Sequence, residues 1–210
     1  WSEAQRLEAS DGAPGDHFGR FVSVDGNSAL IGATVWNESR GAVYAFERDG
    51  RGQWREVQRL TPTDMEPGDA FGRNVARDGD VAAVGTWGHR NGTGAVYILR
   101  RGRDGQWTQE AKLMASDAAE EQWFGQSLAL RGDLLVAGAP QTNGSRGAVY
   151  TFRRGVDGAW TETTKMEVAD AAENYAFGNA VLLVGDRLLI GAVGADEYTG
   201  KVHVYAAGEE

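Results

Sequence analysis

The chain has 210 residues, a formal net charge of −9 and no cysteine. An acidic surface argues against binding of nucleic acids or anionic membranes, which both need positive charge. Without cysteine there are no disulfides, thiolate metal sites or cysteine nucleophiles, and no apolar run approaches the roughly 18 residues of a membrane span. The chain contains 30 glycines and 4 prolines, which favours an ordered fold with many tight turns.

Tryptophan, Phe-Gly, aspartate and glycine recur along the whole chain at a constant spacing of 53 residues. The phenylalanines are Phe18, Phe71, Phe124 and Phe177, and the aspartates are Asp11, Asp64, Asp117 and Asp170. A repeat of this length indicates one architecture built from four copies of a unit. We therefore expect a single domain over residues 1–210, divided into repeats 1–53, 54–106, 107–159 and 160–210.

Each unit is predicted to form four short strands. In the first copy they cover residues 1–7, 18–24, 29–33 and 41–48, separated by loops over 8–17 and 34–40 and by an Asp25-Gly26 turn. Asp-Gly between two apolar runs is a strong hairpin signal. The fourth strand of each copy begins at a glycine, and the third is a nearly continuous apolar run suited to a sheet covered on both faces. The sequence thus predicts sixteen strands and almost no helix.

Four-stranded units of about 50 residues are typical of a β-propeller, an all-β fold whose sheets stack as blades around an axis. Stacking covers both faces of each sheet and protects its edges. We expect the recurring phenylalanines to pack between adjacent blades, because a large apolar residue beside a glycine in every copy indicates a repeated close contact.

Two further motifs follow Phe-Gly in the repeat. Gly-Ala-Val-Tyr occurs at 41–44, 94–97 and 147–150 and becomes Gly-Lys-Val-His at 200–203, and Gly-Ala-Pro occurs complete at 138–140. Together these motifs resemble the FG-GAP repeat, which forms the blades of the integrin α-subunit propeller and of many bacterial extracellular proteins. The resemblance covers all 210 residues and implies a propeller with an extracellular or cell-surface location. It implies no particular activity, because propellers carry many unrelated functions.

By the family pattern, residues 1–7 form an outermost strand and residues 18–24 an innermost one. The chain then begins with an outer strand and ends with the third strand of a blade, so one end can complete the blade of the other by strand exchange. Two arrangements leave no edge unpaired: a closed four-bladed ring, or a head-to-tail homodimer of eight blades. We favour the homodimer, because a four-bladed ring demands a steep angle between sheets; a fragment of a longer propeller is the third alternative.

No catalytic constellation is recognisable, and the three histidines occupy different positions of the repeat. We therefore expect no enzymatic activity, no cofactor and no resident metal. The recurring aspartates are expected to cap turns by accepting hydrogen bonds from nearby backbone amides. Calcium binding is the alternative for them, because integrin-like blades often carry Asp-rich calcium loops.

Several loop residues on one face of the predicted propeller occur in only one copy. Those we consider as candidates for ligand binding are Trp36, Trp87, His89, Trp123, Tyr175 and Tyr198. Such side chains either fill local gaps or stay available for a glycan or a protein. Asn37, Asn91 and Asn143 fit the N-glycosylation acceptor pattern, although Asn in such loops also simply favours turns.

Two functions remain open. The favoured one is a non-enzymatic scaffold or protein-interaction module, and the alternative is a carbohydrate-binding propeller that uses the loop aromatics. The units have equal lengths but divergent surfaces, which indicates either strong geometric constraint or a repeat assembly rebuilt by engineering. We expect a second copy, a protein or a glycan as partner, and neither nucleic acid nor membrane insertion.

Overall fold

The computed structural model describes residues 1–206, which form fifteen strands in four antiparallel sheets. Each sheet forms one blade: blades 1 to 3 combine three strands of one repeat with the outer strand that begins the next repeat. Blade 1 holds β1 (Phe18–Asp25), β2 (Ser28–Ala33), β3 (Ala42–Arg48) and β4 (Trp54–Leu60); blade 2 holds β5 (Asn74–Asp78), β6 (Val81–Thr86), β7 (Ala95–Arg101) and β8 (Trp107–Leu113). Blade 3 holds β9 (Ser127–Arg131), β10 (Leu134–Ala139), β11 (Ala148–Arg154) and β12 (Trp160–Met166), and blade 4 holds β13 (Phe177–Val184), β14 (Arg187–Ala192) and β15 (Lys201–Ala206).

The loop between the second and third strands of each blade contains one helical turn. These turns are α1 (Trp36–Ser39), α2 (His89–Gly92), α3 (Thr142–Ser145) and α4 (Ala195–Tyr198). Each includes two residues with left-handed backbone angles, such as Asn37 with φ 51° and Glu38 with φ 62°. No helix within residues 1–206 is long and apolar enough to cross a membrane.

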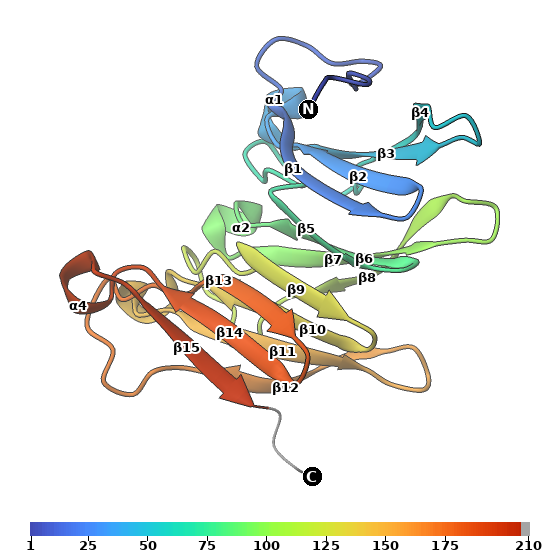
Figure 1. Ribbon diagram of the computed structural model, residues 1–210. Coiled ribbons are helices and arrows are strands. Elements are labelled where there is room, and N and C mark those ends of the chain that lie inside the picture. Colours follow the sequence, from blue (N-terminus) through green and yellow to red (C-terminus); the bar gives the residue numbers. More distant parts are fainter. Residues whose placement is uncertain (207–210) are drawn as a thin grey trace.

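The blades follow one another as an open arc (Figure 1), from the blue first repeat to the red fourth repeat. Within each blade the strands pair in chain order, and the innermost strands contact in the sequence β1, β5, β9, β13. The all-β propeller fold and its four repeats are therefore confirmed. Blades 1 and 4 lie at opposite ends of the arc, so the closed four-bladed ring is not formed in this structure.

The prediction of sixteen strands is wrong by one. Residues 1–7 form no strand, because a strand needs a hydrogen-bonded neighbour and the backbone of this segment has no ladder partner within the described residues. Blade 4 correspondingly has three strands, and β15 is its edge. The remaining predicted strands are present, with the two-residue hairpin loop at Gly26 and Asn27.

Glycine is required where neighbouring blades touch through their backbones. A Cβ atom added to Gly32 in β2 would lie 2.2 Å from the carbonyl oxygen of Gly72 in blade 2. The same collision would occur between Gly85 and Gly125, at 2.1 Å, so every internal junction repeats this approach. Contacts under 3.0 Å cannot be accommodated without moving the backbone, which explains the recurring glycine.

The hydrophobic core lies between the blades. Phe71, Phe124 and Phe177 are fully buried, each between its own blade and the preceding one. The ring of Phe71, for example, packs edge-on against Tyr97 at 5.6 Å and shares a cluster with Val43 of blade 1. Phe18 differs: among residues 1–206 it packs only against blade 1, and it is half-buried.

Candidate protein-interaction site

The recurring aspartates join three parts of the fold. Asp11 accepts a hydrogen bond from the Tyr44 hydroxyl at 2.7 Å and pairs with Arg59 of the outer strand β4. In the next copy, Asp64 accepts from Tyr97 at 2.9 Å and from Lys112 at 2.6 Å. The third copy repeats this with Asp117, which accepts from Tyr150 and Lys165, both at 2.8 Å. Each trio ties a loop, the third strand and the outer strand of one blade together.

The prediction that these aspartates cap turns is therefore wrong, because their main hydrogen-bond donors are side chains and not nearby backbone amides. Their carboxylates bind a tyrosine and a cation distant in sequence, because the fold brings the third and outer strands beside the loop. Partial burial would raise the pKa of Asp64, but the hydrogen bonds from Lys112 and Tyr97 outweigh it and the pKa is lowered. Conversely, burial and the neighbouring Asp64 raise the pKa of the Tyr97 hydroxyl.

Backbone capping is instead done by the side chain five residues further along. Asp16 accepts from the amide of Ala13 at 2.7 Å, and Asp69 accepts from Glu66 at 2.9 Å. Gln122 takes this role in the third copy. No group of three His, Asp or Glu side chains within residues 1–206 is placed to hold a metal ion.

His89 belongs to a buried polar chain and does not face a ligand surface. Its Nδ1 lies 3.0 Å from an oxygen of Asp69, and its Nε2 accepts from the Lys112 ammonium at 2.8 Å. Because Lys112 can only donate, the proton of the neutral ring sits on Nδ1 and is donated to Asp69. The network connects Asp69 to Asp64 through two further side chains.

The other single-copy aromatics lie in separate groups: Trp36 stands apart in blade 1, Trp87 and Trp123 are neighbours, and Tyr175 and Tyr198 line one pocket of blade 4. Trp87 and Trp123 pack against each other with ring centroids 5.0 Å apart, and the Arg59 guanidinium covers Trp36 at 4.4 Å. Tyr175 is buried, whereas Tyr198 is 73% exposed. Asn37, Asn91 and Asn143 are exposed and have positive φ, as expected for asparagine in tight turns.

A different surface stands out at the C-terminal end of the arc. Val202 in β15 is 64% exposed, whereas the valines at the same repeat position, Val43, Val96 and Val149, are fully buried against the following blade. Val204 is 62% exposed, while Ala45 and Ile98 at its position are fully buried. Blade 4 thus presents, uncovered, the face that every other blade buries. We call this surface the C face.

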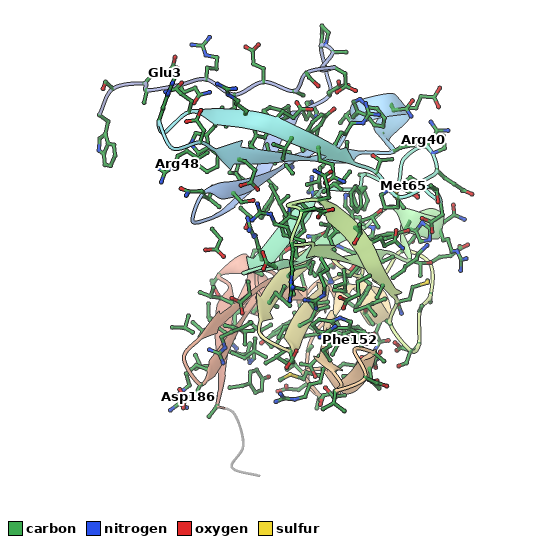
Figure 2. The ribbon with its side chains drawn as sticks, turned by 90° about the vertical axis from the view of Figure 1, so that its right-hand side faces the viewer. Glu3, Arg40, Arg48, Met65, Phe152 and Asp186 are labelled. Carbon is green, nitrogen blue, oxygen red and sulfur yellow. The ribbon has the colours of Figure 1, made fainter. Side chains whose placement is uncertain are left out.

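The opposite end of the arc carries the matching surface. In β1, Val22 is 54% exposed and Val24 is 57% exposed, whereas Val75 and Leu128, which are equivalent to Val22, are buried against the preceding blade. We call this surface, on blade 1, the N face. Glu3 and Asp186 mark the two ends in Figure 2, one near blade 1 and the other on blade 4.

Residues 1–10 rest on blade 1 as an outer strand rests on the next blade. The Gln5 side chain bonds the backbone of Trp54, as Gln58 bonds that of Trp107. Ser10 binds Glu56 as Ser116 binds Glu162. The segment therefore occupies the place of an outer strand, although residues 1–206 contain no sheet with which it pairs.

The two end faces lie outside the single-copy aromatics that the sequence offers as candidates for ligand binding. The signal was present in the repeat itself, because apolar residues such as Val22 and Val202 stand at positions that are apolar in every copy. Only the structure shows that these positions face a neighbouring blade, and that in the part of the chain it describes two of the eight blade faces have no such neighbour.

A comparison with protein-family models identifies the repeat. The model described as FG-GAP repeat matches residues 1–46, 54–99, 107–152 and 160–205, so its four matches start 53 residues apart and span most of the chain. No similar sequence was found among curated proteins.

Proposed function

Because the chain belongs to the FG-GAP repeat family, whose propellers are interaction modules, we propose that it is a non-enzymatic scaffold that binds a second copy of itself head to tail. The C face of one copy covers the N face of the other. The observation that carries this proposal is Val202, which is 64% exposed while its three counterparts are fully buried. Apolar patches of this kind are usual at protein interfaces.

The internal junctions specify the shape of the occupant. Between blades 1 and 2, the face bearing Val43 receives the innermost strand of the next blade, and Gly41 forms a parallel bridge with Phe71. The residue equivalent to Gly41 in blade 4 is Gly200, and the residue equivalent to Phe71 in blade 1 is Phe18. A second copy therefore offers blade 4 the kind of surface that blades 2, 3 and 4 offer their predecessors.

The backbone at the C face supports the same occupant. A Cβ added to Gly191 would meet nothing closer than Ala180 at 3.5 Å, whereas at Gly138, its counterpart in blade 3, it would lie 2.0 Å from the Gly178 carbonyl oxygen. Gly191 thus keeps the clearance that an approaching blade requires. A head-to-tail contact repeats until the ring closes, and two chains give eight blades.

Light scattering at several protein concentrations tests the proposal on the 210-residue chain. We expect a mass of twice 22.6 kDa, about 45 kDa, that decreases on dilution. A mass near 22.6 kDa at every concentration contradicts the proposal, as does an open-ended distribution of larger species. If the two faces are instead covered by other FG-GAP repeats and not by a second copy, the 210-residue chain should stay at about 22.6 kDa at every concentration.

A matched pair of variants distinguishes specific contact through the C face from nonspecific association. Val202→Asp places a charge on the C face and should abolish the dimer. Val156, in the β11–β12 hairpin of blade 3, is fully exposed and belongs to neither face, so Val156→Asp should leave the mass unchanged. Equal loss of association in both variants would argue against specific contact through the C face.

The structure offers less support for a carbohydrate-binding function. Sugar binding by stacking needs an exposed aromatic ring, and of the six candidate side chains only Tyr198 is largely exposed. We therefore propose a protein, in the form of a second copy, as the partner of this chain.

A further inference from the structure

The fourth copy of the aspartate site is incomplete. Asp170 is equivalent to Asp11, Asp64 and Asp117, but it has no hydrogen bond or ion pair to any residue of 1–206, and it is exposed. Its tyrosine is replaced by His203, which instead shares a hydrogen bond of 2.9 Å with the Tyr175 hydroxyl. Within residues 1–206, blade 4 has no outer strand and therefore no counterpart of the cation that completes each of the other three sites.

The space for this cation is open and acidic. A pocket of about 630 Å³ beside β15 is lined by Asp170, Tyr175 and His203. Glu173, Asp196 and Glu197 also line it, and Lys201 is its single lysine or arginine, already paired with Asp196 at 2.9 Å. An excess of carboxylates around an unpartnered aspartate favours an incoming cationic side chain.

The repeat identifies which side chain would arrive. The cations of the complete sites are Arg59, Lys112 and Lys165, and the equivalent residue of the first copy is Arg6. Arg6 lies in the segment that rests on blade 1 in the place that the outer strand of a preceding blade would take. It is largely exposed, and its present ion pair is an exposed one with Glu3, at 3.2 Å, which is weak and readily exchanged.

We propose that the Asp170 pocket is the receptor for the Arg6 side chain of a second copy. This inference rests on the proposed head-to-tail association and adds its register. In blade 1, Val43 pairs with Leu60, Tyr44 with Arg59 and Ala45 with Gln58. By the same register, residues 5–7 of one copy add to β15 of the other as its outer strand, with Arg6 opposite His203 and Leu7 opposite Val202.

Each partner then contributes what the other lacks. The second copy supplies the missing strand and the cation, and blade 4 supplies the free β15 edge, the aspartate and the apolar C face. The Gln5–Trp54 hydrogen bonds hold the incoming segment on its own blade 1, so the strand and the N face arrive together. This pre-organisation lowers the entropic cost of association.

A charge-reversal cycle in the full chain tests the pairing. The measured quantity is the dimer dissociation constant from sedimentation or light scattering. Arg6→Asp and Asp170→Arg should each weaken association by about tenfold or more, as expected when one partner of a charge-assisted hydrogen bond is replaced by a like charge. The double variant carries both changes in one chain, restores an opposite-charge pair at the junction, and should regain most of the affinity.

Arg103→Asp is the control for Arg6→Asp, because both variants change the net charge by the same amount. Arg103 is exposed in the β7–β8 hairpin and makes no ion pair within residues 1–206. Circular dichroism should show all variants folded. If the wild-type chain dimerises but the double variant is no tighter than the single ones, the pairing is wrong and the head-to-tail dimer stands. If the wild-type chain is a monomer at all concentrations, both proposals fail.

Discussion

The Gln5 side chain bonds both polar backbone groups of Trp54, donating to its carbonyl oxygen at 2.8 Å and accepting from its amide at 2.9 Å. Gln58 holds Trp107 in the same way, with both distances 2.8 Å. The outer strand of one blade is thus fixed to the first residue of the next blade's outer strand. This clamp explains why residues 1–10 keep their position although they pair with no sheet in the described part of the chain.

Substitution of Gly191 should affect dimerisation without affecting the stability of the folded chain. Gly191→Ala should leave the chain folded, because the added Cβ has ordinary contacts in blade 4, but it should abolish dimerisation by colliding with the incoming backbone. Melting temperature at low concentration and mass at high concentration report the two effects separately.

Two other glycines provide controls for the Gly191→Ala variant. Gly32→Ala places its Cβ 2.2 Å from the Gly72 carbonyl oxygen inside the chain and should destabilise the fold itself. Gly50→Ala has open space and should change neither stability nor mass. A Gly191→Ala chain that dimerises like the wild type would show that no blade docks on this face as the internal blades do.

The phenylalanines should differ according to their number of neighbouring blades. Phe71→Ala, Phe124→Ala and Phe177→Ala each remove a fully buried ring, and each should lower the free energy of unfolding by about 3–5 kcal/mol. Phe18→Ala should cost clearly less at concentrations where the chain is monomeric, because that ring is half-buried. Denaturant titrations measure all four, and equal losses at the four positions would contradict the open end of blade 1.

The aspartate sites predict a loss of stability in acid. Partial burial opposes ionisation of Asp64 and Asp117, but hydrogen bonds from a lysine and a tyrosine lower both pKa values below those of the unfolded chain. A lowered pKa stabilises the fold above the unfolded value, and that contribution disappears as the pH falls below about 4 and through the folded value. The slope of unfolding free energy against pH between about 2 and 5 should therefore be shallower for Asp64→Asn than for the wild type.

Removal of metal should not affect stability. Asp11, Asp64 and Asp117 each already pair with an arginine or lysine of the protein, and their neighbouring loops provide no further carboxylate cluster within residues 1–206. The melting temperature is expected to be the same in chelator and in millimolar calcium. A decrease in chelator that calcium alone reverses would show that these sites hold calcium.

The repeat in the sequence was sufficient to predict the fold, because positions such as Phe71 and Gly32 serve the same contact in every copy and their spacing is visible without a structure. The partners of Asp11 could not be predicted, because Tyr44 and Arg59 reach it only through the pairing of strands far apart in sequence. His89 appeared available as a single-copy residue, yet its neighbours Asp69 and Lys112 enclose it. Burial depends on what covers a position, and the same valine is buried in blade 3 and exposed in blade 4.

The clamp between successive outer strands also determines how the molecule comes apart. Since each blade is held by contacts to its neighbours, loss of one blade weakens the next, and stability behaves as a chain of nearest-neighbour couplings. Among residues 1–206, blade 4 is coupled on one side only and has no strand paired with the outer edge of β15. In the monomer, the amide hydrogens of blade 4 should exchange with solvent first, followed by those of blade 3. Unfolding is then expected to start at blade 4 and to proceed along the arc.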